Sequence, residues 1–277
     1  MLRAFLPVLT YPTPTALPGL QRALDLVATL QGEVAATIAE VDVPPVSAPL
    51  GPVGIDVSAM AAEAEAMSRS HASDAAGHLR NEAKRLGLEI GIDHVRSRWE
   101  WAAGALAGAA RLHDLSLMAM GDSSDERRVA EALIFESGGP VVLIPASGEA
   151  PVHLNTVAVA WDDSAASAPA LRDAMPLLEA ADRVILLTAD MDKPIDPQSV
   201  EGILAALDRR GIQNSHFEVL VGSGQSVGEA LQAAARRKDA GLLAMGAYGH
   251  SRIREFILGG ATRSVLASLQ MAVLMSH

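Results

Sequence analysis

The chain has 277 residues, 49% of them hydrophobic, and a formal net charge of −11 at pH 7. This length predicts two domains, since single domains mostly run to about 100–200 residues. The negative charge disfavours a nucleic-acid or anionic-membrane surface, and no apolar run reaches the roughly 18 residues of a membrane span. The absence of cysteine excludes disulfides and thiolate metal sites, so we expect a cytoplasmic protein.

Short apolar runs alternate with alanine-rich segments of helical length, which predicts a β-α-β-α order. In the first half we expect strands at Ala4–Leu9, Ala35–Val41, Ile90–Ser97, Leu115–Met120 and Val141–Ile144, and helices at Leu17–Leu30, Ala59–Leu86, Trp101–Leu112 and Asp125–Phe135. In the second half we expect strands at Thr156–Ala160, Arg183–Thr188, His216–Val221, Gly241–Met245 and Ala272–Met275, and helices at Ala165–Ala180, Pro197–Arg210, Val227–Arg237 and Thr262–Ser268. Right-handed crossovers would wind each half into a doubly wound parallel sheet.

Two segments rich in proline, glycine or polar residues interrupt this alternation. Pro44–Gly54 is expected to be a long loop after the second strand, and Ser147–Leu154 is expected to be a linker. The expected domains are therefore residues 1–148 and 154–277.

The two halves contain a repeat. Ala105–Gly121 aligns without gaps on Ala230–Gly246 with ten identities in seventeen positions, of which only four are alanines. Beyond the repeat, the distance to the matching fifth-strand valine is 21 positions in the first half and 27 in the second. We infer a duplication in which the first copy has lost about six residues from one loop, by that subtraction.

A glycine-rich loop, GAYGHSRIREFILGGAT, follows the strand expected at Gly241–Met245 and precedes a helix. Glycines let backbone amides approach anionic oxygens closely, and the helix N-terminus adds partial positive charge. The loop therefore predicts phosphate binding. The alternative is a surface turn whose glycines serve the backbone alone.

The spacing of these glycines resembles the signature of the universal stress protein family. Gly246, Gly249 and Gly259 match that family's Gly-two-residues-Gly-nine-residues-Gly pattern. The family also carries an Asp after its first strand and a Ser two residues later, which VAVAWDDS supplies as Asp162 and Ser164.

The resemblance extends over the whole chain as the family's tandem form. It implies an α/β fold of two five-stranded parallel sheets, each in the order 3-2-1-4-5, that pack as an intramolecular pseudo-dimer. The fifth strands of the two halves are expected to pair. The first half reads FLPVLTYPTPT where the Asp belongs and GDSSDERR where the glycine loop belongs, so we expect a degenerate partner domain.

For the second half, the resemblance implies a site for ATP or AMP, with Mg²⁺ if the ligand is ATP. The residues expected to contact the nucleotide are Ala160, Trp161, Asp162, Ala189, Met245, Gly246, Gly249, His250, Gly259, Gly260, Ala261 and Thr262. Trp161 is expected to contribute its backbone and to pack with its ring. Asp162 has an alternative role in capping the helix that follows.

A competing motif lies at residues 224–228, where GQSVG fits the GxSxG pattern of serine hydrolases. A triad would need Ser226 with Asp239 and with His250 or His277, all within about fifty residues. The alternative for Ser226 is a helix N-cap. HExxH is absent and the eight histidines are scattered, so we expect no metal site.

These features predict a stress-response protein that binds an adenine nucleotide and is regulatory rather than catalytic. The chain has neither a Walker lysine nor a kinase motif set, so we expect slow ATP hydrolysis at most. One alternative is an interaction scaffold that has lost nucleotide binding, since Gly260 replaces a common hydroxyl and Asp163 adds charge. An unknown protein partner and a further homodimer remain compatible with the sequence.

Overall fold

A computed structural model describes residues 1–44, 56–147, 152–190, 195–221, 225–247 and 260–277. The strands are β1 (Arg3–Leu9), β2 (Glu33–Val41), β3 (Ile90–Ser97), β4 (Leu115–Met120), β5 (Val141–Pro145), β6 (Thr156–Ala160), β7 (Arg183–Asp190), β8 (Ser215–Val221), β9 (Leu242–Gly246) and β10 (Ala272–Ser276). The helices are α1 (Leu17–Thr29), α2 (Val57–Leu86), α3 (Ala102–Ala110), α4 (Ser124–Glu136), α5 (Ser167–Asp173), α6 (Met175–Glu179), α7 (Pro197–Asp208), α8 (Val227–Arg237) and α9 (Gly260–Ala267), with a 3-10 turn over Trp99–Trp101.

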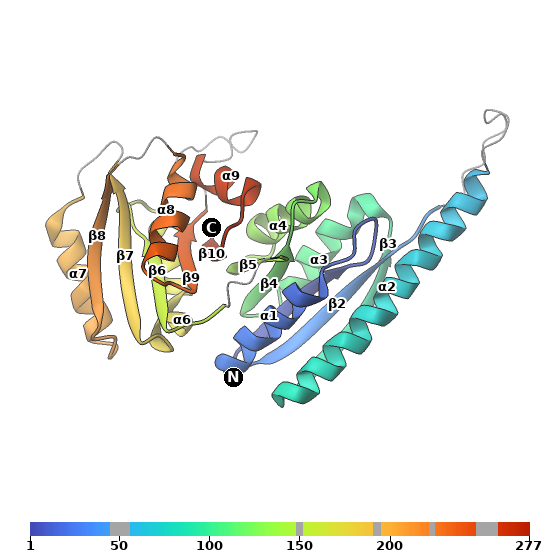
Figure 1. The fold of residues 1–277 in the computed structure, drawn as a ribbon, viewed down its shortest axis with the longest axis horizontal. Coiled ribbons are helices and arrows are strands. Elements are labelled where there is room, and N and C mark those ends of the chain that lie inside the picture. Colours follow the sequence, from blue (N-terminus) through green and yellow to red (C-terminus); the bar gives the residue numbers. More distant parts are fainter. Residues whose placement is uncertain (45–55, 148–151, 191–194, 222–224, 248–259) are drawn as a thin grey trace.

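All ten of these strands belong to one sheet, in the order β3-β2-β1-β4-β5-β10-β9-β6-β7-β8 (Figure 1). Each half has the predicted order 3-2-1-4-5, and the two halves meet where β5 and β10 pair antiparallel. The expected pairing of the fifth strands is therefore confirmed. Every predicted strand is present, with ends that differ by at most two residues.

One predicted helix is wrong. Ala165–Ala180 was expected to be continuous, but it forms two short helices, α5 and α6, that meet at Ala174. Pro176 causes the break, because proline has no N–H to donate to the carbonyl four residues earlier and its ring crowds that carbonyl. The chain restarts with the Ala174 carbonyl, which accepts from the amides of Leu177 and Leu178 at 2.9 and 3.0 Å.

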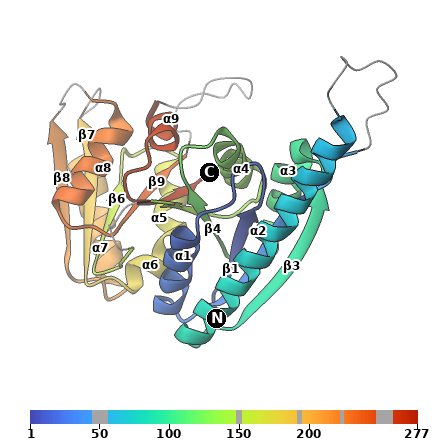
Figure 2. The ribbon, with the colours of Figure 1, turned by 45° about the vertical axis from the view of Figure 1, so that its right-hand side comes forward.

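The helices cover both faces of the sheet, as Figures 1 and 2 show. Neighbouring residues of a strand point to opposite faces, and in β10 Leu274 packs in one apolar cluster while Val273 and Met275 pack in the other. Residues of α1, α2, α5, α6 and α7 join the first cluster, and residues of α3, α4, α8 and α9 join the second. Because both faces are buried, the strands can be apolar along their length, which made them recognisable.

The repeated segments occupy equivalent places. Ala105–Gly121 runs through α3 and β4, and Ala230–Gly246 runs through α8 and β9. The shorter connection predicted for the first copy lies after β4, where residues 121–123 lead directly into α4. Residues 247–259 separate β9 from α9, and most of them lie outside the described residues. Parts of the expected loop Pro44–Gly54 and linker Ser147–Leu154 also lie outside them.

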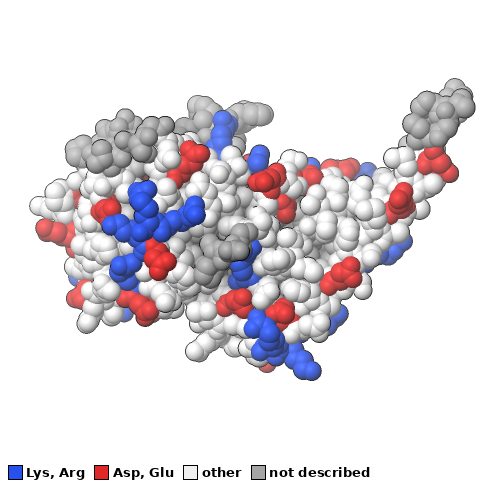
Figure 3. Space-filling model, in the orientation of Figure 1, with Lys and Arg blue, Asp and Glu red and all other residues white. Residues whose placement is uncertain are grey.

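Charged side chains of both signs are mixed on the face drawn in Figure 3, with a gathering of Lys and Arg over α8. The last turn of α8 carries Arg236 and Arg237, and their positive charges interact favourably with the partial negative charge of the helix C-terminus. Lys238 follows and forms an ion pair with Glu218 at 2.7 Å. Among the described residues, no helix combines the length and apolar character needed to cross a bilayer.

The junction between β5 and β10 yields a stability prediction. Leu274 is fully buried opposite Val142, so Leu274→Ala should lower the unfolding free energy by about 2–5 kcal/mol. Leu112 is 77% exposed, and Leu112→Ala should change it by no more than about 0.5 kcal/mol. Urea denaturation followed by circular dichroism measures both. Equal losses in the two variants would contradict the assignment of Leu274 to a shared core.

Candidate functional site

The carboxyl ends of three neighbouring strands meet at one edge of the second half. β6 pairs in parallel with β7 on one side and with β9 on the other. From β6 the chain continues to β7 on one side of β6, and β9 is later added on the other side. The order of the strands in the sheet therefore reverses between β6 and β9, which makes a topological switch point. In open α/β sheets, ligands bind outside the carboxyl ends of the strands at such a point.

Several predicted site residues come together at this edge. Ala160 ends β6, Met245 and Gly246 end β9, and Ala189 lies one residue before the end of β7. Register confirms that β6 and β9 run side by side, because Val159 pairs with Ala244. The structure therefore places the residues after the first and fourth strands of this half beside one another, as the sequence predicted.

Gly246 also has a packing role that the sequence did not reveal. A Cβ at Gly246 would lie 2.4 Å from the carbonyl oxygen of Ala166 and 3.2 Å from the amide nitrogen of Ser167. Real Cβ atoms essentially never approach another atom to 2.4 Å. The end of β9 thus rests against the backbone that enters α5, and only glycine fits there without a shift.

The turn after β6 is held by its own side chains. An Asp162 carboxylate oxygen accepts from the Ser164 amide at 3.1 Å, and the Ser164 hydroxyl accepts from the amides of Ala166 and Ser167 at 3.3 Å each. This is the local bonding by which Asp and Ser stabilise turns and helix starts. Asp162 remains exposed. Both roles considered for Asp162 are therefore compatible with its position, since one oxygen orders the turn while the side chain faces solvent.

Asp163, which the sequence marked only as an added charge, forms a contact with a distant helix. Its backbone has a φ of 59°, in the left-handed region where glycine is favoured. Its carboxylate accepts from the Ser199 hydroxyl at 2.7 Å. Ser199 lies in the first turn of α7, so Asp163 ties the loop after β6 to the start of that helix. Ser199 carried no sequence signal, because this contact joins residues far apart in the chain.

Trp161 packs as expected. It is 9% exposed, belongs to the first apolar cluster, and its backbone amide donates to the Leu187 carbonyl at 2.8 Å. Its indole Nε1 is buried without a hydrogen-bond partner among the described residues. The ring therefore anchors the turn that carries Asp162.

The helix that follows the glycine loop begins at Gly260 and contains Ala261 and Thr262 in its first turn. Gly260 is exposed, Ala261 is half-buried, and Thr262 is 2% exposed. The Ala261 carbonyl oxygen would lie 2.5 Å from a Cβ at Gly228, so this glycine lets α8 and α9 pack closely. The remaining predicted contacts lie outside the described residues, namely Gly249, His250 and Gly259.

The equivalent place in the first half is closed by a carboxylate. Glu126, which is 3% exposed, accepts from the amides of Gly121 and Ser123 at 3.0 and 3.3 Å. These amides lie after β4 and before α4, where the second half has its glycine loop. Burial raises the pKa of Glu126 above its ordinary value, although the two amides act in the opposite direction.

The region after β1 is also closed. The Thr10 hydroxyl donates to the Ala39 carbonyl at 2.6 Å and lies 2.7 Å from the hydroxyl of Ser68 in α2. The ring of His71 bonds to the Thr10 carbonyl at 2.9 Å. Side chains of α2 thus cover the position where the second half carries its exposed Asp162.

Ser226 has the structural role that was the alternative to a nucleophile. It caps α8, and its hydroxyl lies 2.6 Å from a Glu229 carboxylate oxygen, which also accepts from the Ser226 amide at 3.1 Å. The bond to the Ser226 hydroxyl is the main cause of the lowered pKa of Glu229. A capping box therefore explains both residues. Within the described part of the chain, no group of three His, Asp or Glu residues is placed to hold a metal ion.

The fold is a doubly wound α/β architecture, and the carboxyl ends of β6 and β9 form a topological switch point in its second half. Residues 153–277 match the model of the universal stress protein family. These residues therefore carry a universal stress protein domain, which confirms the resemblance noted in the sequence.

Solved structures share the fold of the whole chain. A universal stress protein from Archaeoglobus fulgidus DSM 4304 has a TM-score of 0.70 at 17% identity, covering 99% of this chain and 95% of its own. A protein of unknown function from Pseudomonas aeruginosa PAO1 has a TM-score of 0.56 at 16% identity, covering 99% and 92%. The cytoplasmic domain of a prokaryotic cation chloride cotransporter reaches 0.50 at 12% identity, covering 99% and 94%. No curated protein sequence matches the chain.

The two glycines at this site yield opposite predictions. Gly246→Ala should lower the unfolding free energy by about 1–3 kcal/mol, because its methyl group must displace the Ala166 backbone. Gly260→Ala should raise it by about 0.4–1 kcal/mol, since nothing lies within 4 Å of the added Cβ and alanine favours the helix. Thermal and urea denaturation measure both changes. A neutral Gly246→Ala variant would contradict the packing role.

The buried carboxyl of Glu126 yields a pH prediction. Its pKa is higher in the folded protein than the ordinary value of 4.5, so folding favours the protonated form. The unfolding free energy of the wild type relative to Glu126→Gln should therefore rise as the pH falls from 7 towards 4.5. Urea denaturation of both proteins across this range measures the difference. A difference that is constant or falls at lower pH would contradict the burial effect.

Proposed function

We propose that the second half of the chain binds an adenine nucleotide, ATP or AMP, at the carboxyl edge of β6 and β9. The protein would act in the stress response, in the cytoplasm, as a regulatory nucleotide-binding protein. The observation that carries the proposal is the switch point, where the turn of Asp162 lies beside the end of β9 that leads into the glycine loop.

The nucleotide is oriented by this edge. Adenine and ribose lie against Ala160, Asp162 and Ala189, where the exposed carboxylate can accept from ribose hydroxyls. The phosphates extend toward the glycine loop and the start of α9, where backbone amides and the helix dipole favour negative charge. Mg²⁺ would accompany a triphosphate and offset its negative charge, because this ion needs few protein ligands.

Only the second half would bind nucleotide. In the first half the carboxylate of Glu126 already accepts from the amides of Gly121 and Ser123. A phosphate there would have to displace a buried, negatively charged side chain. The first half is therefore a degenerate partner domain, which extends the sheet through β5 and β10.

The proposal requires no catalytic residue. Backbone amides and a helix N-terminus hold phosphates in place, but they supply no group that removes a proton from an attacking water. Ser226 is committed to the capping box of α8, so a hydrolase function is not proposed. Slow hydrolysis would be a property of the bound ATP rather than of a dedicated site.

An interaction scaffold is the second candidate, and Asp163 is the observation that favours it. Asp163 places a carboxylate in the loop after β6 and in a backbone region where glycine is favoured. The bond to Ser199 directs that carboxylate to α7, which reduces its repulsion of a phosphate. The fold does not distinguish a nucleotide-binding protein from an interaction scaffold, because a transporter domain shares this fold at 12% identity.

Isothermal titration with ATP, AMP and NAD, with and without Mg²⁺, tests the proposal. We expect one site per chain with micromolar affinity for ATP or AMP, and Asp162→Asn should weaken it about tenfold. Asparagine keeps the acceptor for the Ser164 amide, so the loss reports on the ligand. Gly259→Val, in the signature of the loop, should abolish binding.

The control is Asp122→Asn, which removes one exposed carboxylate from the first half and should leave the affinity unchanged. Equal losses in Asp122→Asn and Asp162→Asn would mean that only the overall charge matters. Absence of heat with every nucleotide would remove the proposed function and favour the scaffold.

A further inference from the structure

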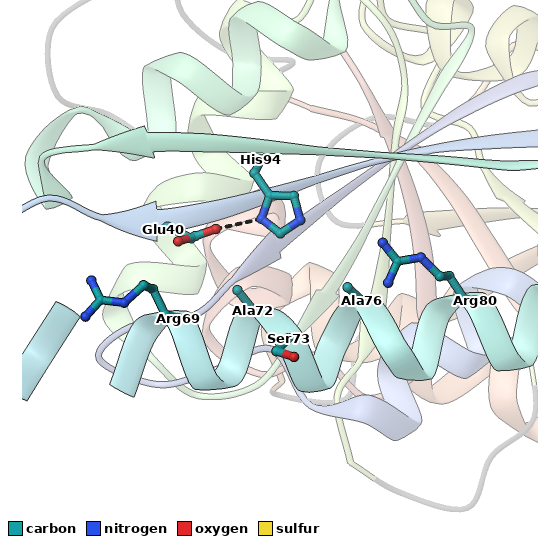
Figure 4. Close-up of a pocket in the computed structure, with 7 residues that line it drawn as sticks. All are labelled: Glu40, Arg69, Ala72, Ser73, Ala76, Arg80 and His94. Atoms are coloured by element: carbon teal, nitrogen blue, oxygen red, sulfur yellow. Dashed lines mark hydrogen bonds and ion pairs between the residues drawn. The ribbon is translucent and has the colours of Figure 1, made fainter. Parts of the chain in front are cut away.

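A crevice lies in the first half, far in the fold from the switch point of β6 and β9. It is a cavity of about 380 Å³ between α2 and the strands β2 and β3, at the end of the ten-stranded sheet (Figure 4). This volume is in the range of small-molecule sites. We call it the α2–β3 crevice; Glu40 and His94 line its strand side, and Arg69, Ala72, Ala76 and Arg80 line its helix side.

Polar residues occupy core-facing positions at this crevice. Ile90 and Ile92 of β3 pack toward α2, and alternation places His94 on the same face. In β2, Ile38 faces α2 and Glu40 follows it on that face. The imidazole Nδ1 of His94 lies 2.6 Å from a Glu40 carboxylate oxygen. The sheet face thus changes from apolar to polar where the cavity opens.

The cavity exists because the facing helix presents small side chains. Ala72 and Ala76 are 2% and 3% exposed and stand one turn apart on α2. Their methyl groups point toward β3 in Figure 4 and leave room that a larger residue would fill. Together they form an apolar floor between the polar strand side and the arginines.

Arg80 supplies an available positive charge. Its side chain is exposed and extends from α2 back toward His94 (Figure 4). It takes part in no hydrogen bond or ion pair with any described residue. His94 uses Nδ1 for Glu40, and its Nε2 has no partner in the described part of the chain. Two nitrogen groups on opposite sides of the cavity are therefore open to a ligand.

The acidic groups around the crevice are already engaged. Glu40 is bonded to His94, and Glu65 forms ion pairs with Arg96 at 2.9 Å and Arg69 at 3.5 Å. Glu65 also accepts from the Val43 amide, the main cause of its lowered pKa. The unpaired group is a guanidinium, whose planar fork suits a carboxylate or a phosphate.

We infer that the α2–β3 crevice binds a small organic anion, with its carboxylate or phosphate between Arg80 and His94 and its apolar part on Ala72 and Ala76. The site is independent of the proposed nucleotide site, since it belongs to the other half of the chain. A ligand there would link α2 to the edge strand β3.

The test uses nuclear magnetic resonance of the full chain labelled with ¹⁵N, titrated with inorganic phosphate and with succinate at constant ionic strength. We expect saturable shifts of the His94 ring nitrogens and of the amides at residues 72–80 with at least one probe. Arg80→Gln should weaken the binding about tenfold, because the main charge-assisted hydrogen bonds are lost. His94→Gln should weaken it as well.

The matched control is Arg237→Gln, which removes another exposed arginine late in a helix, in the second half. It changes the net charge equally and should leave the affinity for the probe unchanged. Shifts that fail to saturate, equal weakening by Arg80→Gln and Arg237→Gln, or shifts confined to residues 260–262 would each overturn the proposal. The last outcome would leave the nucleotide site as the anion site of the chain.

Discussion

The antiparallel pairing of β5 with β10 is the interaction on which the rest of the structure depends. Val141, Val142 and Leu143 pair with Met275, Leu274 and Val273, and all six are fully buried. This contact turns two five-stranded sheets into one and removes an edge from each, where unpaired backbone groups would otherwise be exposed. Because β5 and β10 run antiparallel, the strands of the two halves point in opposite directions. The carboxyl ends of β4 and β9 therefore lie on opposite sides of the molecule along the strand direction.

The fold was predictable because its strands are buried on both faces. Runs such as Leu115–Met120 and Val141–Pro145 are apolar almost throughout and stand out from the alanine-rich helices. Two features were harder to read. The break at Pro176 was missed because the apolar pattern continues across it. The pairing of halves came from the family resemblance, since short-range pattern carries no information on which edges meet.

The candidate site was predictable only where it follows from strand ends. The positions of Asp162 and Gly246 relative to the strands could be predicted, because Asp162 follows an apolar run closely and Gly246 ends one. The contacts that tune the site join distant residues and leave no local pattern, as with Asp163 and Ser199. Gly246 shows a further limit, because its spacing suggested a ligand and the structure adds a packing requirement against Ala166.

The two copies differ in the connection that follows the fourth strand of each half. After β4, the short connection lets Glu126 reach back to the amides of Gly121 and Ser123, so the helix start is neutralised from within the chain. After β9, α9 begins beyond a longer connection, and no capping carboxylate of this kind occurs within the described first turn of α9. Under the proposed function, a ligand phosphate would take the place after β9 that the Glu126 carboxylate takes after β4, so the side chain would prevent phosphate binding in the first half.

This divergence fits a chain with a net charge of −11. Long-range attraction would not bring a nucleotide to such a surface, so any anion must be held by short-range donors. In the two proposed sites, backbone amides at the switch point would provide such donors without adding a positive side chain, and Arg80 would provide them in a crevice whose carboxylates are already paired. The acidic surface therefore restricts anion binding to places where the local geometry concentrates N–H groups.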